Sequence, residues 1–490
     1  MNRFPLFRSP AKAGAQPPAP KMGPGLRRGA RVSVFAAASA LALAACTTVG
    51  PDYKTPAPNA PALTPFVESA SPAFTGDEPP GRWWSLFQDP VLDGLIEQAL
   101  AANTDLRVAA ANLAQARAVL RETRAGRLPS TNLSGGATYG DQPGPGGADT
   151  NFDVGLDVGY QLDLFGRIRR ATEAGRADVE AVQAAFDLSR ITVAAETARA
   201  YSDACNFGRQ LEVARESVRI QEQTFDLTRR LVAGGRGTAL DTGQAGSLME
   251  QVRAQVPTLD GERRAALYRL AVLTGRPPAD FPPIVAQCST PPALSKPIPV
   301  GNGASLLARR PDIRRSEREL AAATARIGVA TAELYPDIRL GLSLGSTASS
   351  IGGLASGSGL RFGLGPLISW TFPNRAVARS RIAQAQAGAQ AALARFDGTW
   401  LGALQETETA LARYANELDR VAILRRARAN SLEAARVARL RYRAGRESFQ
   451  IVLEAERSLS QTEALLAQSE AQLSTDLVSV FLALGGGWQA

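Results

Sequence analysis

The chain contains an internal repeat of more than two hundred residues. Four pairs of short motifs carry it: Asn103–Leu106 with Arg310–Ile313, Leu128-Pro129 with Tyr335-Pro336, Phe186-Asp187 with Phe396-Asp397, and Gly235-Arg236 with Gly445-Arg446. The separation is 207 residues for the first two pairs and 210 for the last two, which indicates one three-residue insertion. Units this long are not short-period solenoid repeats, so the sequence indicates duplication of a whole supersecondary assembly.

Composition excludes several classes of function. The formal net charge is +9, but residues 1–46 hold seven Lys/Arg and no Asp/Glu, which leaves 48 basic against 46 acidic residues in the rest. We therefore expect no nucleic-acid partner. The chain has no histidine, which removes histidine-based triads and most catalytic zinc sites. We expect no enzyme activity, no cofactor and no metal site.

The N-terminus has the pattern of an export signal. Arginines at 27, 28 and 31 precede an apolar run of 14 residues, Val32 to Ala45, which is shorter than the ~20 residues that span a bilayer as a helix. We interpret residues 1–45 as a signal peptide, and our hypothesis is that translation begins at Met22. The sequence Leu43-Ala44-Ala45-Cys46 resembles a bacterial lipobox, so Cys46 is the expected lipidation site. The alternative is an ordinary signal peptide with a chance cysteine.

Composition shifts divide the remaining chain. Residues 46–82 are rich in Pro, Ala, Thr and Ser and are expected to form an extended, lipid-anchored arm. Residues 83–274 form the first repeat, in which Asp89 and Pro90 signal the start of a helix that we expect to continue to about Arg124. Residues 275–302 contain eight prolines and form a connector, and residues 303–490 form the second repeat.

Each repeat contains a predicted strand hairpin. In residues 152–164, apolar and aromatic side chains alternate with glycine and aspartate (Asp153, Asp157 and Asp163), and residues 338–344 and 360–372 show the same period of two. A soluble sandwich would also alternate. Strands of about 12 residues with aromatic ends, however, favour a membrane crossing. Four strands cannot close on themselves and open edges are not tolerated in hydrocarbon, so we expect three chains to share twelve strands.

A very long helix follows each hairpin. The predicted helices cover about 168–232 and 375–443, on the order of 100 Å each. Each ends at a glycine turn and returns as another helix, to about Thr274 and Leu484. A simple coiled coil is the alternative, but it would not explain the strands. Cys205 on the first long helix and Cys288 in the connector are expected at similar height, either as a disulfide or as two buried free thiols.

Motifs along nearly the whole mature chain are similar to those of the TolC-like outer-membrane factors, in their lipoprotein (NodT or OprM type) branch. These motifs are Cys46–Tyr53, Trp83-Trp84, Asp89–Leu92, Asp163–Arg167, Arg309–Ile313, Tyr335-Pro336, Phe372–Arg375 and Tyr442–Phe449. The resemblance implies a homotrimer with a 12-stranded transmembrane β-barrel continuous with a periplasmic α-helical barrel. It also implies an efflux exit duct that docks onto a periplasmic adaptor (membrane fusion protein) and an inner-membrane pump of the resistance-nodulation-division type.

The same resemblance assigns roles to the helical tips. Adaptor contacts would fall on Gly235, Arg236, Gly237 and Thr238, and on Gly445, Arg446, Glu447 and Ser448. The acidic gate residue falls on Glu454, with Arg443 and Arg446 nearby, while Ile451 stands where some relatives have a second acid. The alternative is an ordinary solvated Glu454. Other functions left open are a duct for type I protein or polysaccharide secretion and a trimeric surface stalk or adhesin.

Overall fold

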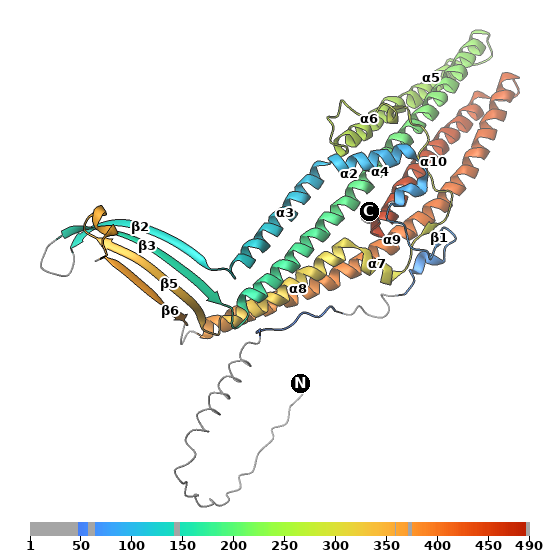
Figure 1. The fold of residues 1–490 in the computed structure, drawn as a ribbon. Coiled ribbons are helices and arrows are strands. Elements are labelled where there is room, and N and C mark those ends of the chain that lie inside the picture. Colours follow the sequence, from blue (N-terminus) through green and yellow to red (C-terminus); the bar gives the residue numbers. More distant parts are fainter. Residues whose placement is uncertain (1–47, 57–63, 142–147, 358, 371–374, 487–490) are drawn as a thin grey trace, which may run out of the picture.

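The computed structural model describes residues 48–56, 64–141, 148–357, 359–370 and 375–486. The signal segment, Met22 and Cys46 lie outside these ranges. The protomer is long and narrow, with one β-sheet at one end and two helical turns at the other (Figure 1). Within the described residues, no helix has both the length and the apolar character needed to cross a bilayer.

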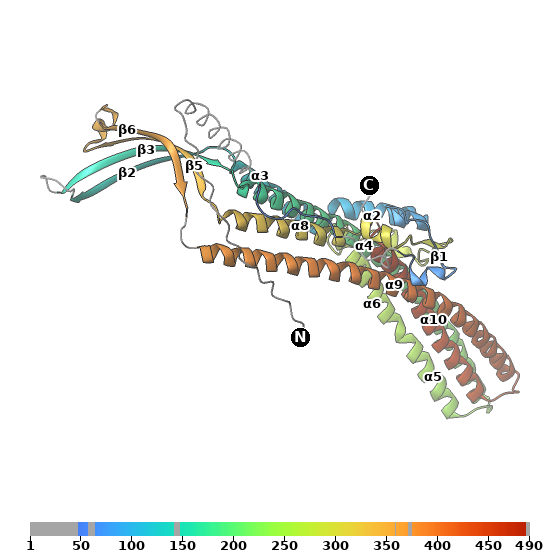
Figure 2. The ribbon, with the colours of Figure 1, turned by 90° about the horizontal axis from the view of Figure 1, so that it is seen from below.

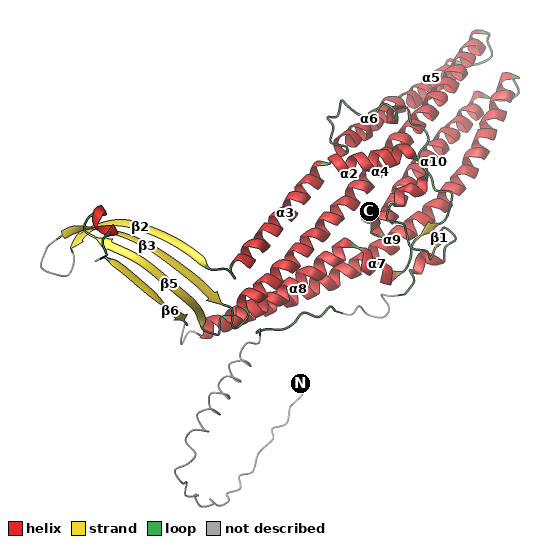
Figure 3. Ribbon diagram, viewed as in Figure 1, coloured by secondary structure: helices red, strands yellow, loops and turns green. Residues whose placement is uncertain are grey.

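Each repeat contributes one hairpin to a single four-stranded sheet. The strands are β2 (Ser130–Asp141), β3 (Ala148–Leu162), β5 (Asp337–Ala348) and β6 (Leu360–Ser369). Their order is β2-β3-β5-β6 and every pairing is antiparallel. The sheet is a curved single layer, and the short 3-10 helix η5 (Ile351–Ala355) packs against one end of it (Figure 3). The repeats therefore join through β3 and β5, which leaves β2 and β6 as the sheet edges.

The two faces of the sheet have opposite chemistry, as the alternation predicts. Leu156 pairs with Leu133 and Leu344, so these three apolar side chains share a face. The neighbouring Asp157 pairs with Ser343 on the opposite face. The large apolar side chains are exposed, and Phe362 keeps 80% of its surface accessible. One face of the sheet is thus largely apolar, and its large side chains stay exposed in the described protomer.

Asp163 differs from our expectation that it belongs to the acidic face of the sheet. Strand β3 ends at Leu162, and the Asp163 carboxylate accepts hydrogen bonds from the backbone N–H of Ile168 (2.9 Å) and Arg169 (2.8 Å). These donors are among the unpaired groups of the first turn of α4. Asp163 therefore caps a helix.

The long helices match the predicted boundaries closely. They are α4 (Arg167–Ala233, 67 residues) and α9 (Arg375–Arg443, 69 residues). At ~1.5 Å per residue each is about 100 Å long. They run from the end of the sheet to the distant tips, and α8 (Pro311–Ala332) packs against both (Figure 2).

The predicted single helix over residues 90–124 is wrong in one respect. It is two helices, α2 (Pro90–Ala102) and α3 (Thr104–Ala125), separated by Asn103. The Asn103 side chain accepts from the N–H of Asp105 at 2.8 Å, so it caps α3 instead of continuing α2. The break lets α2 turn away across the middle of the molecule.

The return helices show the duplication at atomic detail. The first copy is split into α5 (Ala239–Arg253) and α6 (Gln255–Leu273), while the second is the continuous α10 (Phe449–Ala483). Asn103 donates to the carbonyl of Leu273, the last residue of α6, at 3.1 Å. Arg310, the equivalent residue, donates to the carbonyl of Ala483, the last residue of α10, at 2.6 Å. Each repeat therefore closes by the same contact.

The largest hydrophobic core lies around the middle of the molecule. Trp83, in the 3-10 helix η3 (Trp83–Phe87), is fully buried and stacks on Phe481 of α10 with ring centroids 4.7 Å apart. The arm and the connector add to this core. Their short elements include η2 (Val67–Ala70), β1 (Phe74–Thr75) and β4 (Ile298–Pro299), and β1 pairs in parallel with β4. The arm thus has more structure than its composition indicates.

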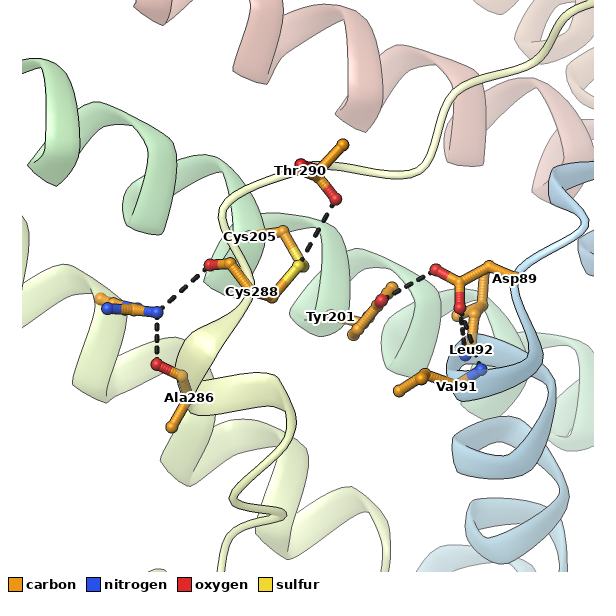
Figure 4. Close-up of a disulfide and its surroundings, with 9 residues drawn as sticks. Asp89, Val91, Leu92, Tyr201, Cys205, Ala286, Cys288 and Thr290 are labelled. Carbon is orange, nitrogen blue, oxygen red and sulfur yellow. Dashed lines mark hydrogen bonds between the residues drawn. A yellow bond between two sulfur atoms is a disulfide. The ribbon is translucent and has the colours of Figure 1, made fainter.

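Cys205 of α4 and Cys288 of the connector form a disulfide, the first of the two alternatives left open by the sequence (Figure 4). Cys288 follows η4 (Val285–Gln287), and its carbonyl accepts from Arg263 of α6 at 3.2 Å. One turn earlier on α4, Tyr201 donates to Asp89, the N-cap of α2, at 2.8 Å. The bond therefore fixes the connector where α2, α4 and α6 meet.

We expect removal of this disulfide to destabilise the middle of the molecule. The bond closes a loop with a sequence separation of 83 residues. Cross-links of this kind typically contribute about 2–4 kcal/mol. The double variant Cys205→Ala/Cys288→Ala should unfold at lower temperature than the oxidised protein in circular dichroism, and reductant should change only the unvaried protein. Equal unfolding temperatures with and without the bond would contradict this expectation.

Candidate functional site at the helical tips

The two helical turns farthest from the sheet are built alike. Each long helix ends at a glycine with positive φ, Gly235 (74°) and Gly445 (69°). The N–H of Arg236 donates to the carbonyl of Leu231 at 2.8 Å, and that of Arg446 donates to Arg441 at 2.9 Å. This pattern is the Schellman motif, in which only glycine adopts the left-handed position without strain. Both turns are therefore tightly defined.

The helices that leave the two turns begin differently. Thr238 and Asp241 form a capping box at the start of α5, since the N–H of Thr238 donates to Asp241 at 2.7 Å and the N–H of Asp241 donates back to Thr238 at 3.3 Å. Ser448 makes no side-chain cap at the start of α10, where Ile451 occupies the position equivalent to Asp241. The missing acid at 451 thus also removes a helix cap.

The two turns touch. A Cβ atom added to Gly445 would lie 2.1 Å from a guanidinium nitrogen of Arg236. The Arg236 side chain of the first tip therefore packs against the backbone of Gly445 in the second. The sequence placed Gly235–Thr238 and Gly445–Ser448 at one end of the molecule, but it gave no sign of this contact.

The expected gate residues are exposed on the second tip. Glu454 lies on α10 two turns beyond Ser448, and Arg443 and Arg446 are likewise exposed. Within the described part of the protomer, the ion pairs do not join Glu454 to either arginine; the tip pair is Arg441 with Glu447, at 3.6 Å. Neutralisation of Glu454 by its own neighbours is therefore not seen.

A buried acid that sequence reasoning missed lies two residues further on. Glu456 is 2% exposed, accepts from Gln221 of α4 at 2.8 Å and pairs with Arg439 of α9 at 2.8 Å. Burial raises the pKa of the Glu456 carboxyl above its ordinary value, although the nearby Arg439 opposes the shift. One carboxylate thus ties α10 to both long helices just above the tips.

Glu456 is the first of three glutamates at seven-residue spacing on α10. Glu463 pairs with Arg428 of α9 at 3.1 Å and accepts from Ser217 of α4 at 3.3 Å. Glu470 pairs with Arg425 of α9 at 2.9 Å and with Arg209 of α4 at 3.6 Å. A seven-residue interval returns to the same helix face. We call this row, Glu456, Glu463 and Glu470, the glutamate ladder; it joins the helical hairpins of the two repeats.

The chain has no histidine, and among the described residues no group of three or more Cys, Asp and Glu side chains is placed to hold a metal ion. Of the acids near the tips, Asp241 caps α5 and Glu447 pairs with Arg441, whereas Glu454 is exposed. The polar contacts of the glutamate ladder hold α10 against α4 and α9 close to the tips.

Comparison with known proteins identifies the family. Residues 95–276 and 303–486 each match the outer membrane efflux protein family. Nodulation protein T of Rhizobium leguminosarum bv. trifolii is 30% identical over 91% of this chain and 96% of its own length. Outer membrane protein OprJ of Pseudomonas aeruginosa is 32% identical over 92% of this chain and 94% of its own length.

Solved structures of outer-membrane channels have the same fold as this chain. The outer-membrane channel OprN superposes with a TM-score of 0.83 at 36% identity, covering 91% of this chain and all of that one. CusC superposes with a TM-score of 0.79 at 28% identity, covering 90% of this chain and all of that one. The repeated hairpins, the long helices and these similarities lead to one conclusion: the chain belongs to the outer membrane efflux protein family and is an outer-membrane channel, the exit duct of a tripartite efflux system.

Proposed function

We propose that three copies of the chain assemble into one continuous duct. The observation that carries this proposal is the sheet, which in the described protomer has two unpaired edge strands, β2 and β6, and one largely apolar face. Unpaired edges are not stable in hydrocarbon. Pairing β2 of one protomer with β6 of the next, three times, gives a closed 12-stranded barrel with its apolar face toward lipid. The long helices then continue as a periplasmic helical barrel.

The duct would be anchored and completed by partners. Lipidation of Cys46 would add acyl chains to the outer-membrane attachment. The tips at Gly235–Thr238 and Gly445–Ser448 would meet a periplasmic adaptor, and the pump behind it would be of the resistance-nodulation-division type. Relatives named as a cation efflux protein, CusC, and a toluene efflux pump protein, TtgC, show that cargo varies in the family. We propose small organic molecules as cargo, as the name of the toluene efflux relative TtgC indicates for that protein.

The resting duct would be closed at the tips. In a trimer, three Glu454 side chains would face a narrow passage, and like charges at close range favour bound cations or nearby arginines. Arg443 and Arg446 are exposed and unpaired with acids in the described protomer, so they are free to reach Glu454 of a neighbouring copy. Closure would then depend on contacts between protomers.

Planar-bilayer recording of the purified protein tests the duct and its gate together. We expect a mass corresponding to three chains, and small single-channel conductance from the closed tips. Glu454→Ala combined with Arg446→Ala should raise the conductance several-fold, because it removes both signs of charge from the constriction. Glu262→Ala, an exposed acid on α6, is the control and should leave conductance unchanged. A monomeric protein without pores would refute the proposal, and equal conductance would remove the gate role of Glu454.

A further inference from the structure

The start of the described arm is held by one buried arginine. Arg170 lies in the first turn of α4, and only 5% of its side chain is exposed. Its guanidinium donates to the carbonyls of Val49 (3.0 Å) and Gly50 (3.1 Å) and to the carboxylate of Asp52 (2.8 Å). Hydrogen bonds from a charged donor are stronger than neutral ones. An otherwise extended arm is therefore fixed at this point.

Two glycines let the arm lie directly on α8. Gly50 has φ of +93°, and a Cβ atom added to it would lie 2.4 Å from the Cα of Gly328. A Cβ atom on Gly328 would lie 2.8 Å from the carbonyl oxygen of Val49. The backbones of the arm and α8 thus meet where neither residue has room for a side chain.

Tyr53 extends the contact across both repeats. Its hydroxyl donates to Glu317 of α8, and the guanidinium of Arg318 lies 5.7 Å from its ring centroid. The ring packs against buried alanines of both helices, Ala177 of α4 and Ala321 and Ala322 of α8. The arm is therefore bound to the first repeat through Arg170 and to the second through Gly328 and Glu317.

The location of these contacts relates them to the lipid anchor. The N–H of Val49 donates to the carbonyl of Phe165 at 3.3 Å, between the end of β3 and the start of α4. In the sequence, Cys46 precedes Thr48 by only two residues. We propose that residues 48–53 form a clasp, with Arg170 as its positioning residue, that holds the lipid anchor at the strand–helix boundary. This rests on the proposed lipidation of Cys46.

The clasp would fix the position of the lipid anchor relative to the membrane. The strand–helix boundary is where the proposed barrel leaves the membrane, so acyl chains attached there enter the lipid beside their own protomer. A free arm of this composition would instead sample many positions. By joining α4 to α8, the clasp would also hold the two repeats together directly below the sheet.

Lysine usage provides a direct test. After Cys46, lysine occurs only at Lys54 and Lys296, and Pro297 follows Lys296. A lysine-specific endoprotease should therefore cut the folded, detergent-solubilised protein only after Lys54, directly behind the clasp. Cleavage requires local opening of the arm, so its rate reports the fraction of time that the clasp is open.

Two variants should open the clasp by different routes. Arg170→Met removes the guanidinium, and Gly50→Val forces the arm off α8 without altering any helix. We expect both to be cut roughly tenfold or more faster than the unvaried protein, because hydrogen bonds to the charge are lost or displaced. Arg176→Met, an exposed arginine of α4 outside the clasp, should be cut at the unvaried rate. Thermal unfolding of each variant separates arm release from misfolding.

The released fragment completes the test. After cleavage, the fragment Cys46–Lys54 should co-elute with the unvaried protein in gel filtration and separate from both clasp variants. Equal cleavage rates in all four proteins would overturn the clasp. Mass spectrometry of the fragment reports its acyl chains independently: a fragment without them would overturn the anchor, while the cleavage rates would still decide whether the clasp exists.

Discussion

Leu156→Arg is expected to abolish insertion of the channel into the outer membrane. Leu156 is near the middle of β3, on the face it shares with Leu133 and Leu344. An arginine facing lipid at the bilayer midplane costs about 2–4 kcal/mol. The proposed trimer carries this cost three times, about 6–12 kcal/mol in all, which is comparable with the whole stability of a typical folded protein. Membrane fractionation and the amount of trimer recovered from outer membranes measure the effect.

The adjacent residue supplies the matched control. Asp157→Arg places the same side chain one position along β3, on the polar face opposite Ser343. We expect this variant to insert normally and to shift the ion selectivity of the pore toward anions, because a ring of negative charge becomes positive. If Asp157→Arg blocked insertion as strongly as Leu156→Arg, the faces would be assigned the wrong way round.

The sequence predicts the elements of this fold well for a physical reason. Strands that alternate over a dozen residues and helices with more than sixty residues repeat their signal many times, so single exceptions do not hide it. The break at Asn103 was missed because the helical pattern continues on both sides of it. The Asn-Thr-Asp sequence at this point is nevertheless a local capping signal for a new helix.

Residues of the helical tips could be predicted only where the local sequence determines the backbone conformation. Gly235 and Gly445 end helices in the left-handed conformation, which glycine after a long helical pattern signals directly. Glu456 gave no such signal, because a glutamate on an amphipathic helix looks solvated until the packing is known. Arg170 was hidden for the same reason, since its partners come from an arm more than a hundred residues earlier. Polar contacts between residues far apart in the chain produce no periodic pattern in the sequence.

Breaking the glutamate ladder is expected to have the second large effect, on both stability and conductance. Arg439→Met would leave the Glu456 carboxylate buried without its cation, and breaking a buried pair from one side costs about 3–5 kcal/mol. Because Glu456 joins α10 to α4 and α9, we expect the loss to lower the unfolding temperature and to loosen the tips, which raises single-channel conductance. Circular dichroism and bilayer recording measure the two effects.

The double variant separates the charge from the packing. Arg439→Met/Glu456→Met replaces the pair with apolar side chains of similar size, which is often neutral or stabilising. It should therefore recover most of the stability lost in Arg439→Met, with an interaction energy that a double-mutant cycle resolves. Equal losses in the single and double variants would show that Arg439 acts through its aliphatic packing.

The pH dependence of Arg439→Met follows from the direction of the Glu456 shift. Burial already raises the pKa of this carboxyl in the folded state, and Arg439 lowers it, so the variant should raise it further. A group that binds its proton more tightly when folded stabilises the protein as pH falls through its folded pKa, and loses that contribution as pH rises. The stability defect of Arg439→Met should therefore shrink on acidification from neutral pH toward the ordinary glutamate range. A defect that stays constant across this interval would show that Glu456 does not take up a proton when its arginine is removed.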